Sequence, residues 1–429
     1  MISRMFIFSM MLLILLQSCS RDGGDKNTPL VSIQIHDRNG LTETISTPDR
    51  LELFEAVDFL APQPYKKVLR VYRQSGKTSA KITSYHPNGL PYQYLETQDM
   101  RAFGVFKEWH QNGQLKIEAT VIGGVADITP GAQKDWLFDG LAKVYDDQGR
   151  RIAEIPYDKG AMEGKSLYYY PNGQLQKELP YHKNELDGEA IEYLPDGKLK
   201  SKTIFQSGLK NGESIGFWSE TRPAWKESYH GGLLSEAEYY SKSGSVIAQV
   251  KYSQGFQAVF EEEQLSQLIE IRKGKPEGIV KQFTPSGELL SVYNVKLGKK
   301  QGEETIYYSS SEREDGTENP LPKLVVPWID DSISGIVKTW YPNGKLESQR
   351  ELSRSKKMGP AFAWYRDGGL MYMEEYEEDR LVKGTYYKKN QKDPISSVTN
   401  GNGTATLFDE QGIFLRKVSY IKGKPTEPE

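Results

Sequence analysis

Residues 164–188 read GKSLYYYPNGQLQKELPYHKNELDG, and variants of this stretch recur along most of the chain. A leading glycine opens each unit, and Gly140, Gly164, Gly188 and Gly212 follow one another at steps of 24 residues. A second glycine, nine residues further on, keeps the same step. A fixed period of this length indicates a repeat architecture in which each unit stacks on its neighbours.

Columns of similar residues stand at fixed offsets from the leading glycine. Offset five carries an aromatic residue and offset nine the turn glycine, while offsets eleven and seventeen are mostly apolar. Because these apolar columns are odd and the even positions are polar, the pattern predicts strands with one apolar face. The residues that define the repeat are Trp109, Tyr145, Tyr169, Tyr193, Trp340 and Trp364 at offset five, and Gly113, Gly173, Gly197, Gly344 and Gly368 at offset nine.

The turn inside each unit has its own signature, YPNG at residues 170–173 and again at 341–344. Proline holds φ negative, which favours a type I turn, and glycine takes the left-handed position that follows. This chemistry predicts a hairpin closed by a loop with a bulge. Since a single hairpin is marginal in water, neighbouring hairpins must pair edge to edge.

The sequence therefore predicts an all-β fold, an elongated antiparallel β-hairpin repeat array that forms a twisted meander or solenoid. One short helix is allowed at residues 261–271, and Thr47 and Pro48 have the chemistry of a helix start. The insertions at 114–140 and 236–277 have no role that the sequence identifies. The expected organisation is a signal peptide at 1–18, a tether at 19–29, an N-terminal segment at 30–78, repeat blocks at 79–308 and 328–424, a linker at 309–327 and a tail at 425–429.

The first twenty residues have the pattern of a targeting signal. An apolar run from Met5 to Leu16 has the length of a signal-peptide core and is too short to span a bilayer. It leads to Cys19, the single cysteine of the chain, in a stretch that resembles a bacterial lipobox. The resemblance implies cleavage before Cys19 and acylation of that residue, which would anchor the protein in the cell envelope, at the outer membrane or the periplasmic face. An ordinary cleaved signal peptide and a short membrane anchor are the alternatives.

The repeat unit resembles the bacterial variant of the MORN repeat, in particular the group known as YwqK-type antitoxin proteins. The residues that carry the resemblance are clearest in the unit that contains Tyr169, Gly173 and Tyr181. The family implies β-hairpin arrays that bind other molecules, and the antitoxin label implies a protein partner.

Composition and motifs favour binding over catalysis. The 55 basic and 58 acidic residues leave a net charge of −3, which gives no general attraction to nucleic acid. Four of the five histidines, His86, His110, His182 and His230, occupy repeat columns, so no metal site and no cofactor is predicted. We find no phosphate-binding loop and no nucleophile elbow, and we expect the protein not to be an enzyme.

Exposed tyrosines are the predicted binding feature. We expect Tyr168, Tyr170, Tyr341 and Tyr365 to point away from the apolar face and to form a strip that binds a partner. The alternative is that tyrosine is simply preferred in strands and beside turns. Three functions remain open: a protein-interaction or envelope scaffold module, an immunity protein that neutralises a toxin, and an enzyme that acts on envelope polymer.

Overall fold

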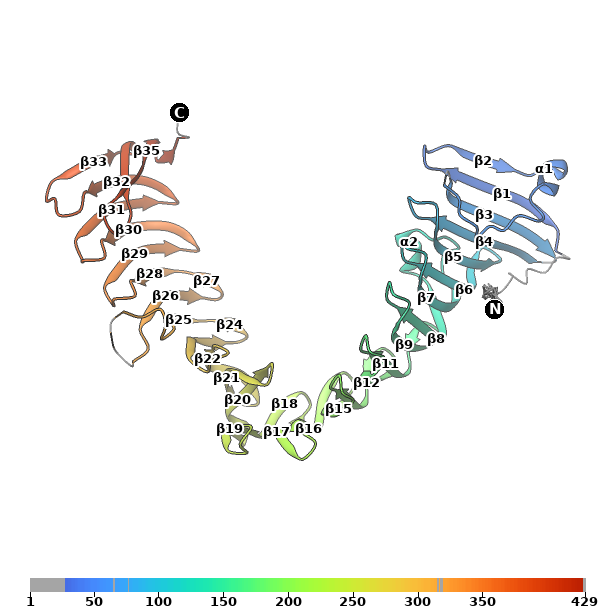
Figure 1. The fold of residues 1–429 in the computed structure, drawn as a ribbon, viewed down its shortest axis with the longest axis horizontal. Coiled ribbons are helices and arrows are strands. Elements are labelled where there is room, and N and C mark those ends of the chain that lie inside the picture. Colours follow the sequence, from blue (N-terminus) through green and yellow to red (C-terminus); the bar gives the residue numbers. More distant parts are fainter. Residues whose placement is uncertain (1–27, 65, 76, 315, 317–318, 427–429) are drawn as a thin grey trace, which may run out of the picture. The chain divides into compact units, whose positions relative to one another are not determined.

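The computed structural model describes residues 28–426, apart from residues 65, 76, 315 and 317–318. Its strands belong to a single antiparallel sheet in which successive strands pair as a meander (Figure 1). The predicted all-β array of hairpins is therefore confirmed. The predicted signal peptide and the acylation site at Cys19 lie outside the described residues.

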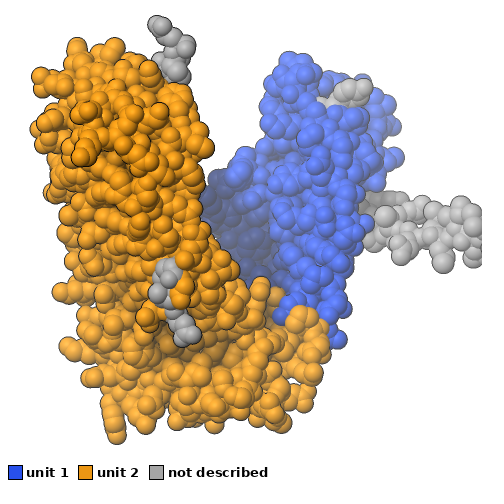
Figure 2. Space-filling view, turned by 60° about the vertical axis from the view of Figure 1, so that its left-hand side comes forward, with its two compact units in different colours: residues 1–174, 181–184 blue, residues 175–180, 185–429 orange. Residues whose placement is uncertain are grey.

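Contacts divide the chain into two compact units, which Figure 2 colours separately. Unit 1 comprises residues 1–174 and 181–184, and unit 2 comprises residues 175–180 and 185–429. The elements of unit 1 are β1 (Leu30–Asp37), β2 (Thr42–Ile45), α1 (Pro48–Glu52), β3 (Lys66–Ser75), β4 (Lys77–Tyr85), β5 (Pro91–Gln98), β6 (Arg101–Trp109), β7 (Leu115–Gly123), α2 (Pro130–Gln133), β8 (Leu137–Tyr145), β9 (Arg151–Asp158), β10 (Ala161–Met162) and β11 (Gly164–Tyr169).

Strand β12 (Leu175–His182) contributes residues to both units. The elements that follow it in unit 2 are β13 (Glu185–Leu186), β14 (Gly188–Tyr193), β15 (Leu199–Gln206), β16 (Leu209–Ser219), β17 (Arg222–His230), β18 (Leu233–Tyr240), β19 (Val246–Lys251), β20 (Gln254–Glu261), β21 (Gln264–Arg272), β22 (Lys275–Phe283), β23 (Leu289–Lys296), β24 (Lys299–Lys300), β25 (Gly302–Tyr307), β26 (Pro322–Ile329), β27 (Ser332–Ile333), β28 (Gly335–Trp340), β29 (Leu346–Ser353), β30 (Lys356–Trp364), β31 (Leu370–Glu377), β32 (Arg380–Tyr387), β33 (Pro394–Thr399), β34 (Asn402–Phe408), β35 (Phe414–Ile421) and β36 (Lys424–Pro425).

The prediction that all odd offsets share one face is wrong, because hairpins of the repeat such as β14–β15 contain a bulge before the turn. In β14, Ala190 stands opposite Thr203, and the register shifts between Glu192 and Tyr193. Ala190 and Phe205, at offsets two and seventeen, therefore share one face, while Tyr193, at offset five, points to the other. We call the side that carries Ala190 face A and the side that carries Tyr193 face B.

Face A buries small residues at offset two. Ser166, Ala190 and Ser214 occupy this offset in successive repeats, and each is less than a tenth exposed. Side chains this short bring little apolar area, so a single layer of strands buries narrow stripes and no deep core. Because little apolar area has to be buried, the chain can fold as a sheet with few aliphatic residues for its length.

The leading glycine of several repeats has two reasons to be glycine. Gly188 has φ of 112°, a region that L-residues rarely adopt. A Cβ at this position would also lie 3.3 Å from the ring of Pro180, on the preceding strand. Gly335 repeats the arrangement with Pro327 at 3.0 Å. The glycine that recurs every 24 residues thus marks the place where one hairpin packs closely against the next.

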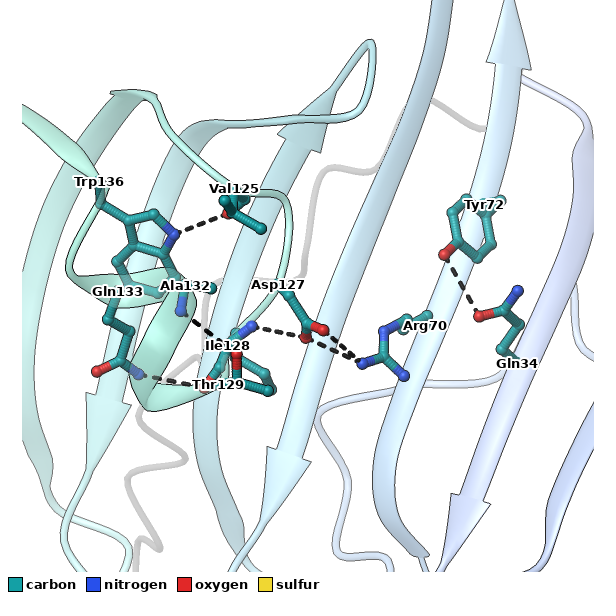
Figure 3. A network of polar contacts seen from close by, with 10 residues as sticks. All are labelled: Gln34, Arg70, Tyr72, Val125, Asp127, Ile128, Thr129, Ala132, Gln133 and Trp136. Carbon is teal, nitrogen blue, oxygen red and sulfur yellow. Dashed lines mark hydrogen bonds and ion pairs between the residues drawn. The ribbon is translucent and has the colours of Figure 1, made fainter.

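The insertion after β7 covers face A of the first strands. Only residues 124–136 are inserted, since the rest of 114–140 belongs mainly to β7 and β8. Trp136 packs edge-on against Phe106 with ring centroids 4.9 Å apart, and its indole N–H donates to the carbonyl of Val125 at 2.9 Å. Arg70 of β3 holds the other end through Asp127 at 2.9 Å (Figure 3). This segment gives unit 1 a second layer and hence a true core.

Residues 46–64 cover face B of the same strands. Leu51 is buried, Phe54 and Phe59 pack in the same cluster, and the hydroxyl of Tyr85 donates to the carbonyl of Phe59 at 2.6 Å. Helix α1 begins at Pro48, as its sequence predicts, although the side chain of the preceding Thr47 makes no capping hydrogen bond.

Two further expectations need correction in unit 2. Residues 261–271, expected to form a helix, belong to strands β20 and β21, which are joined by a turn in which Glu262 and Glu263 have φ of 46° and 63°. The linker expected at 309–327 is shorter, because Pro322 already begins β26, and that strand pairs with β25 across the loop. The sheet thus continues through both segments.

Candidate functional site

The YPNG turns have the predicted geometry. The N–H of Gly173 donates to the carbonyl of Tyr170 at 2.9 Å, which closes the type I turn, and Gly173 itself has φ of 84°. The N–H of Tyr170 in turn donates to the carbonyl of Gln174 at 2.8 Å. The side-chain oxygen of Asn172 accepts from the N–H of Gln174 at 3.0 Å, which explains why Asn or Asp precedes the glycine.

Side chains of these turns bind the next turn along the row. The hydroxyl of Tyr341 donates to the carbonyl of Trp364 at 2.8 Å, and that of Tyr365 to the carbonyl of Tyr387 at 2.7 Å. Asn343 adds a bond from its amide to the carbonyl of Arg366 at 3.1 Å. Neighbouring repeats are therefore tied at their turns as well as along their strands.

The predicted binding strip of tyrosines is wrong as an exposed surface. Tyr341 and Tyr365 are 4% and 0% exposed, because their hydroxyls make the bonds between turns. Tyr168 and Tyr170 are half-buried. Burial and the neighbouring Tyr181 and Tyr157 raise the pKa of Tyr168. These four residues hold the fold and are not brought together as a site.

Histidines take the same structural place in the turn row. The ring nitrogen Nε2 of His86 lies 2.8 Å from the carbonyl of Trp109, and that of His110 lies 3.0 Å from the carbonyl of Tyr145. Among the described residues, no group of three His, Cys, Asp or Glu side chains is arranged to hold a metal ion. No helix in the described part of the chain has the length and apolarity to cross a membrane.

The aromatic column at offset five lies on face B, and its residues are half-buried. Tyr169 donates to Glu154 at 2.8 Å, and Tyr193 donates to Glu178 at 2.7 Å, each from one repeat to the previous one. The glutamate column that sequence reasoning treated as a wet face thus accepts hydrogen bonds from the next repeat. The other aromatic residues of the offset-five column, Trp109, Tyr145, Trp340 and Trp364, are half-buried as well. The turn glycines at offset nine all have positive φ, namely Gly113, Gly197, Gly344 and Gly368.

Strand β17 of unit 2 carries a buried carboxylate. Glu227 is 7% exposed and accepts hydrogen bonds from the hydroxyls of Tyr239 at 2.6 Å and Tyr229 at 3.0 Å, and from the amide of Gln257 at 3.1 Å. Burial, with the charge of Glu227, raises the pKa of both tyrosines far above the ordinary value. The oxygens of Glu227 are thus occupied by protein donors, as in a structural centre.

An open groove lies beside the long loop after β25. It has a volume of about 420 Å³, within the range of small binding sites. Apolar side chains form much of it, and Glu312 and Lys323 meet at 3.0 Å on its rim. The backbone N–H of Ser309, together with Lys323, lowers the pKa of Glu312 to about 2, so this carboxylate stays charged at any ordinary pH.

Comparison with known proteins identifies the repeat. Residues 104–122, 162–183, 186–207 and 333–352 match the family model described as MORN repeat variant. No curated protein matches the chain. These four segments coincide with hairpins of the sheet, so the sequence pattern and the structure define the same unit.

Solved structures share only a distant likeness. The chain is similar to the crystal structure of TcdB2-TccC3-Cdc42, with 10% identity, coverage of 87% of this chain and 24% of that chain, and a TM-score of 0.12. A porin-like protein from Bacteroides uniformis gives 12% identity, coverage of 55% and 91%, and a TM-score of 0.16. The chain spans about a quarter of the length of the former. Likeness at this level carries no argument about function.

Proposed function

We propose that the chain is a non-enzymatic, lipid-anchored protein-interaction module of a bacterial cell envelope. The observation that carries the proposal is the bonding between turns, such as that from Tyr365 to the carbonyl of Tyr387. Each repeat is held in place by its neighbours, so the array can present side chains at fixed spacing over a long surface. Rigid presentation of this kind favours binding, because little conformational entropy is lost on association.

The acyl anchor rests on sequence evidence. Cys19 is the single cysteine of 429 residues and lies three residues after the end of an apolar run of signal-peptide length. Acyl chains at Cys19 would hold the array at the outer membrane or at the periplasmic face. More than one chain is needed for stable attachment, since a single chain binds a membrane marginally.

Cross-linking in intact cells followed by mass spectrometry tests the interaction. We expect one envelope protein to cross-link repeatedly to the array, and we expect the yield to fall for Cys19→Ser. Radiolabelled palmitate that is still incorporated by Cys19→Ser would contradict the anchor. The finer hypothesis of an immunity protein requires that the cross-linked partner be a toxin.

A further inference from the structure

Two side chains in one row of turns of unit 2 are not explained by the fold. The hairpins of this row close through two-residue turns whose first residue has positive φ, a geometry that favours Asn, Asp and Gly. Tyr252 takes this position with φ of 50° and Leu297 with φ of 52°. Their side chains are 87% and 86% exposed, so neither gains from burial what the backbone strain costs.

Equivalent turns in the described repeats use polar residues or glycine at this position. The φ values at this position lie between 44° and 50° in five examples: Lys183, Ser207, Asp330, Arg354 and Glu378. A bulky apolar residue at such a place is a backbone outlier whose advantage must lie outside the chain. The turns of Tyr252 and Leu297 are also close in the row, since a single turn, Lys273–Gly274, lies between them.

The three turns form a connected edge. The N–H of Gly274 donates to the carbonyl of Ser253 at 3.0 Å, which joins the first two turns directly. Strand β22 begins after the Lys273–Gly274 turn and pairs with β23, which ends at the turn of Leu297. At about 4.8 Å per strand, successive turns of the row stand roughly 10 Å apart.

Five exposed lysines surround the two apolar tips, and we call this surface the basic turn edge: Lys251, Lys273, Lys275, Lys296 and Lys299. None of the five pairs with a carboxylate of the described residues. Two of the carboxylates nearby are engaged, since Glu270 pairs with Arg272 at 2.7 Å and Glu236 accepts the N–H of Tyr252 at 2.9 Å.

A hollow opens beside the same turns. It has a volume of about 290 Å³, and Phe256 and Ile271 contribute its apolar lining. Arg272 and Lys273 bring positive charge to the lining and Glu270 brings one negative charge, so the charged groups of the lining leave one positive charge in excess. An apolar side chain fits a space of this size and lining, provided that negative charge accompanies it. The basic turn edge thus combines apolar tips, an apolar hollow and unpaired cations.

We propose that the basic turn edge is the docking surface for an acidic segment of a protein partner that carries apolar side chains. The inference rests on the proposed interaction function and names the chemistry of the partner. Charge complementarity selects an acidic chain, while Tyr252 and Leu297 supply apolar contacts of the kind that dominate binding energy. The cations follow a line of turns one hairpin wide, which suits an extended peptide better than the broad basic face that a membrane surface engages.

Fluorescence polarisation with the full chain tests the proposal, with a short labelled peptide of Glu and Asp that carries Phe residues as the probe. We expect binding that weakens with salt, and we expect the double variant Tyr252→Asn, Leu297→Asn to weaken it about tenfold or more. Because Asn suits the left-handed region, this variant should keep or raise the Tm. A loss of affinity in a protein of undiminished stability separates binding from folding.

Met100→Asn is the matched control, because Met100 is another exposed apolar residue at positive φ in such a turn, with φ of 62° and 75% exposure, but lies in unit 1. Peptide binding should not change in this variant. Equal affinity of the double variant and the unchanged protein, or binding of a Lys-rich peptide as tightly as the acidic one, would overturn the proposal. So would binding to vesicles of phosphatidylcholine and phosphatidylglycerol in place of the peptide. If one of these results is obtained while an envelope protein still cross-links to the chain in cells, the docking surface alone is wrong and the proposed interaction function stands.

Discussion

Replacing Glu227 by Leu is expected to destabilise the part of unit 2 around β17 by about 3 kcal/mol. The carboxylate accepts from Tyr239 at 2.6 Å, from Tyr229 at 3.0 Å and from Gln257 at 3.1 Å. Leu at this position would leave two buried hydroxyls unsatisfied, and each costs about 1–3 kcal/mol. Gln257 is half-exposed and can turn to water, while the loss of a buried charge offsets part of the cost.

The triple variant Glu227→Leu, Tyr229→Phe, Tyr239→Phe separates hydrogen bonding from shape. Removing donors and acceptor together leaves no unsatisfied group, so we expect the cost to fall to about 1 kcal/mol or less. Glu238→Leu is the matched control, since Glu238 is exposed where Tyr240 donates to it, and we expect about 0.5 kcal/mol or less.

Hydrogen–deuterium exchange read by mass spectrometry on peptides from β17 to β20 measures these effects where they occur. A global melting curve is less informative, because a repeat array loses stability locally. If the triple variant exchanges as fast as Glu227→Leu alone, the unsatisfied hydroxyls are not the cause and the reasoning fails.

Three further outcomes are expected. Tyr365→Phe should destabilise its turn by about 1 kcal/mol, seen as faster exchange around the carbonyl of Tyr387, whereas Tyr307→Phe, whose hydroxyl bonds no described residue, should change little. Gly173→Ala should cost about 1 kcal/mol by the same assay, because its φ of 84° is strained for alanine while nothing blocks the methyl. Burial, reinforced by Glu374, raises the pKa of Tyr372 to about 12, so its stabilising effect should be intact below about pH 10 and be lost as the pH rises toward 12, as followed by phenolate absorbance.

Local chemistry was predicted well from sequence. The turn at 170–173 forms as expected because Pro171 and Gly173 restrict their own backbones, whatever surrounds them. The start of α1 at Pro48 follows the same logic. Features that depend on one residue and its immediate neighbours need no knowledge of the fold.

Features that depend on pairing between strands were predicted poorly. Counting odd and even offsets assumes unbroken alternation, and the bulge between Glu192 and Tyr193 moves the aromatic column to the other face. Residues 261–271 contain no glycine or proline, so the turn at Glu262 and Glu263 gave no signal, and pairing with neighbouring strands overrode the helical pattern.

The predicted tyrosine strip failed for a related reason. Strand alternation predicts an exposed tyrosine at offset six, yet the hydroxyls of Tyr341 and Tyr365 form hydrogen bonds between turns, and both side chains are buried. The basic turn edge was missed, although a signal existed: the positions of Tyr252 and Leu297 are those where other repeats carry Lys, Ser or Asp. A bulky residue where the turn prefers a small or polar one was the clue.

This contrast suggests where binding specificity lies in such an array. Columns that repeat, such as Gly188 or Tyr365, are fixed by contacts with the next hairpin and tolerate little change. The first residue of a two-residue turn can be almost fully exposed, as Tyr252 and Leu297 are at 87% and 86%, so the sheet places little constraint on the side chain there. A row of such positions, spaced by roughly 10 Å and held rigid by the columns, gives the chain a surface that can differ between relatives while the sheet stays the same. Tyr252 and Leu297 are therefore informative because they break the repeat, and the residues that keep it report only on the fold.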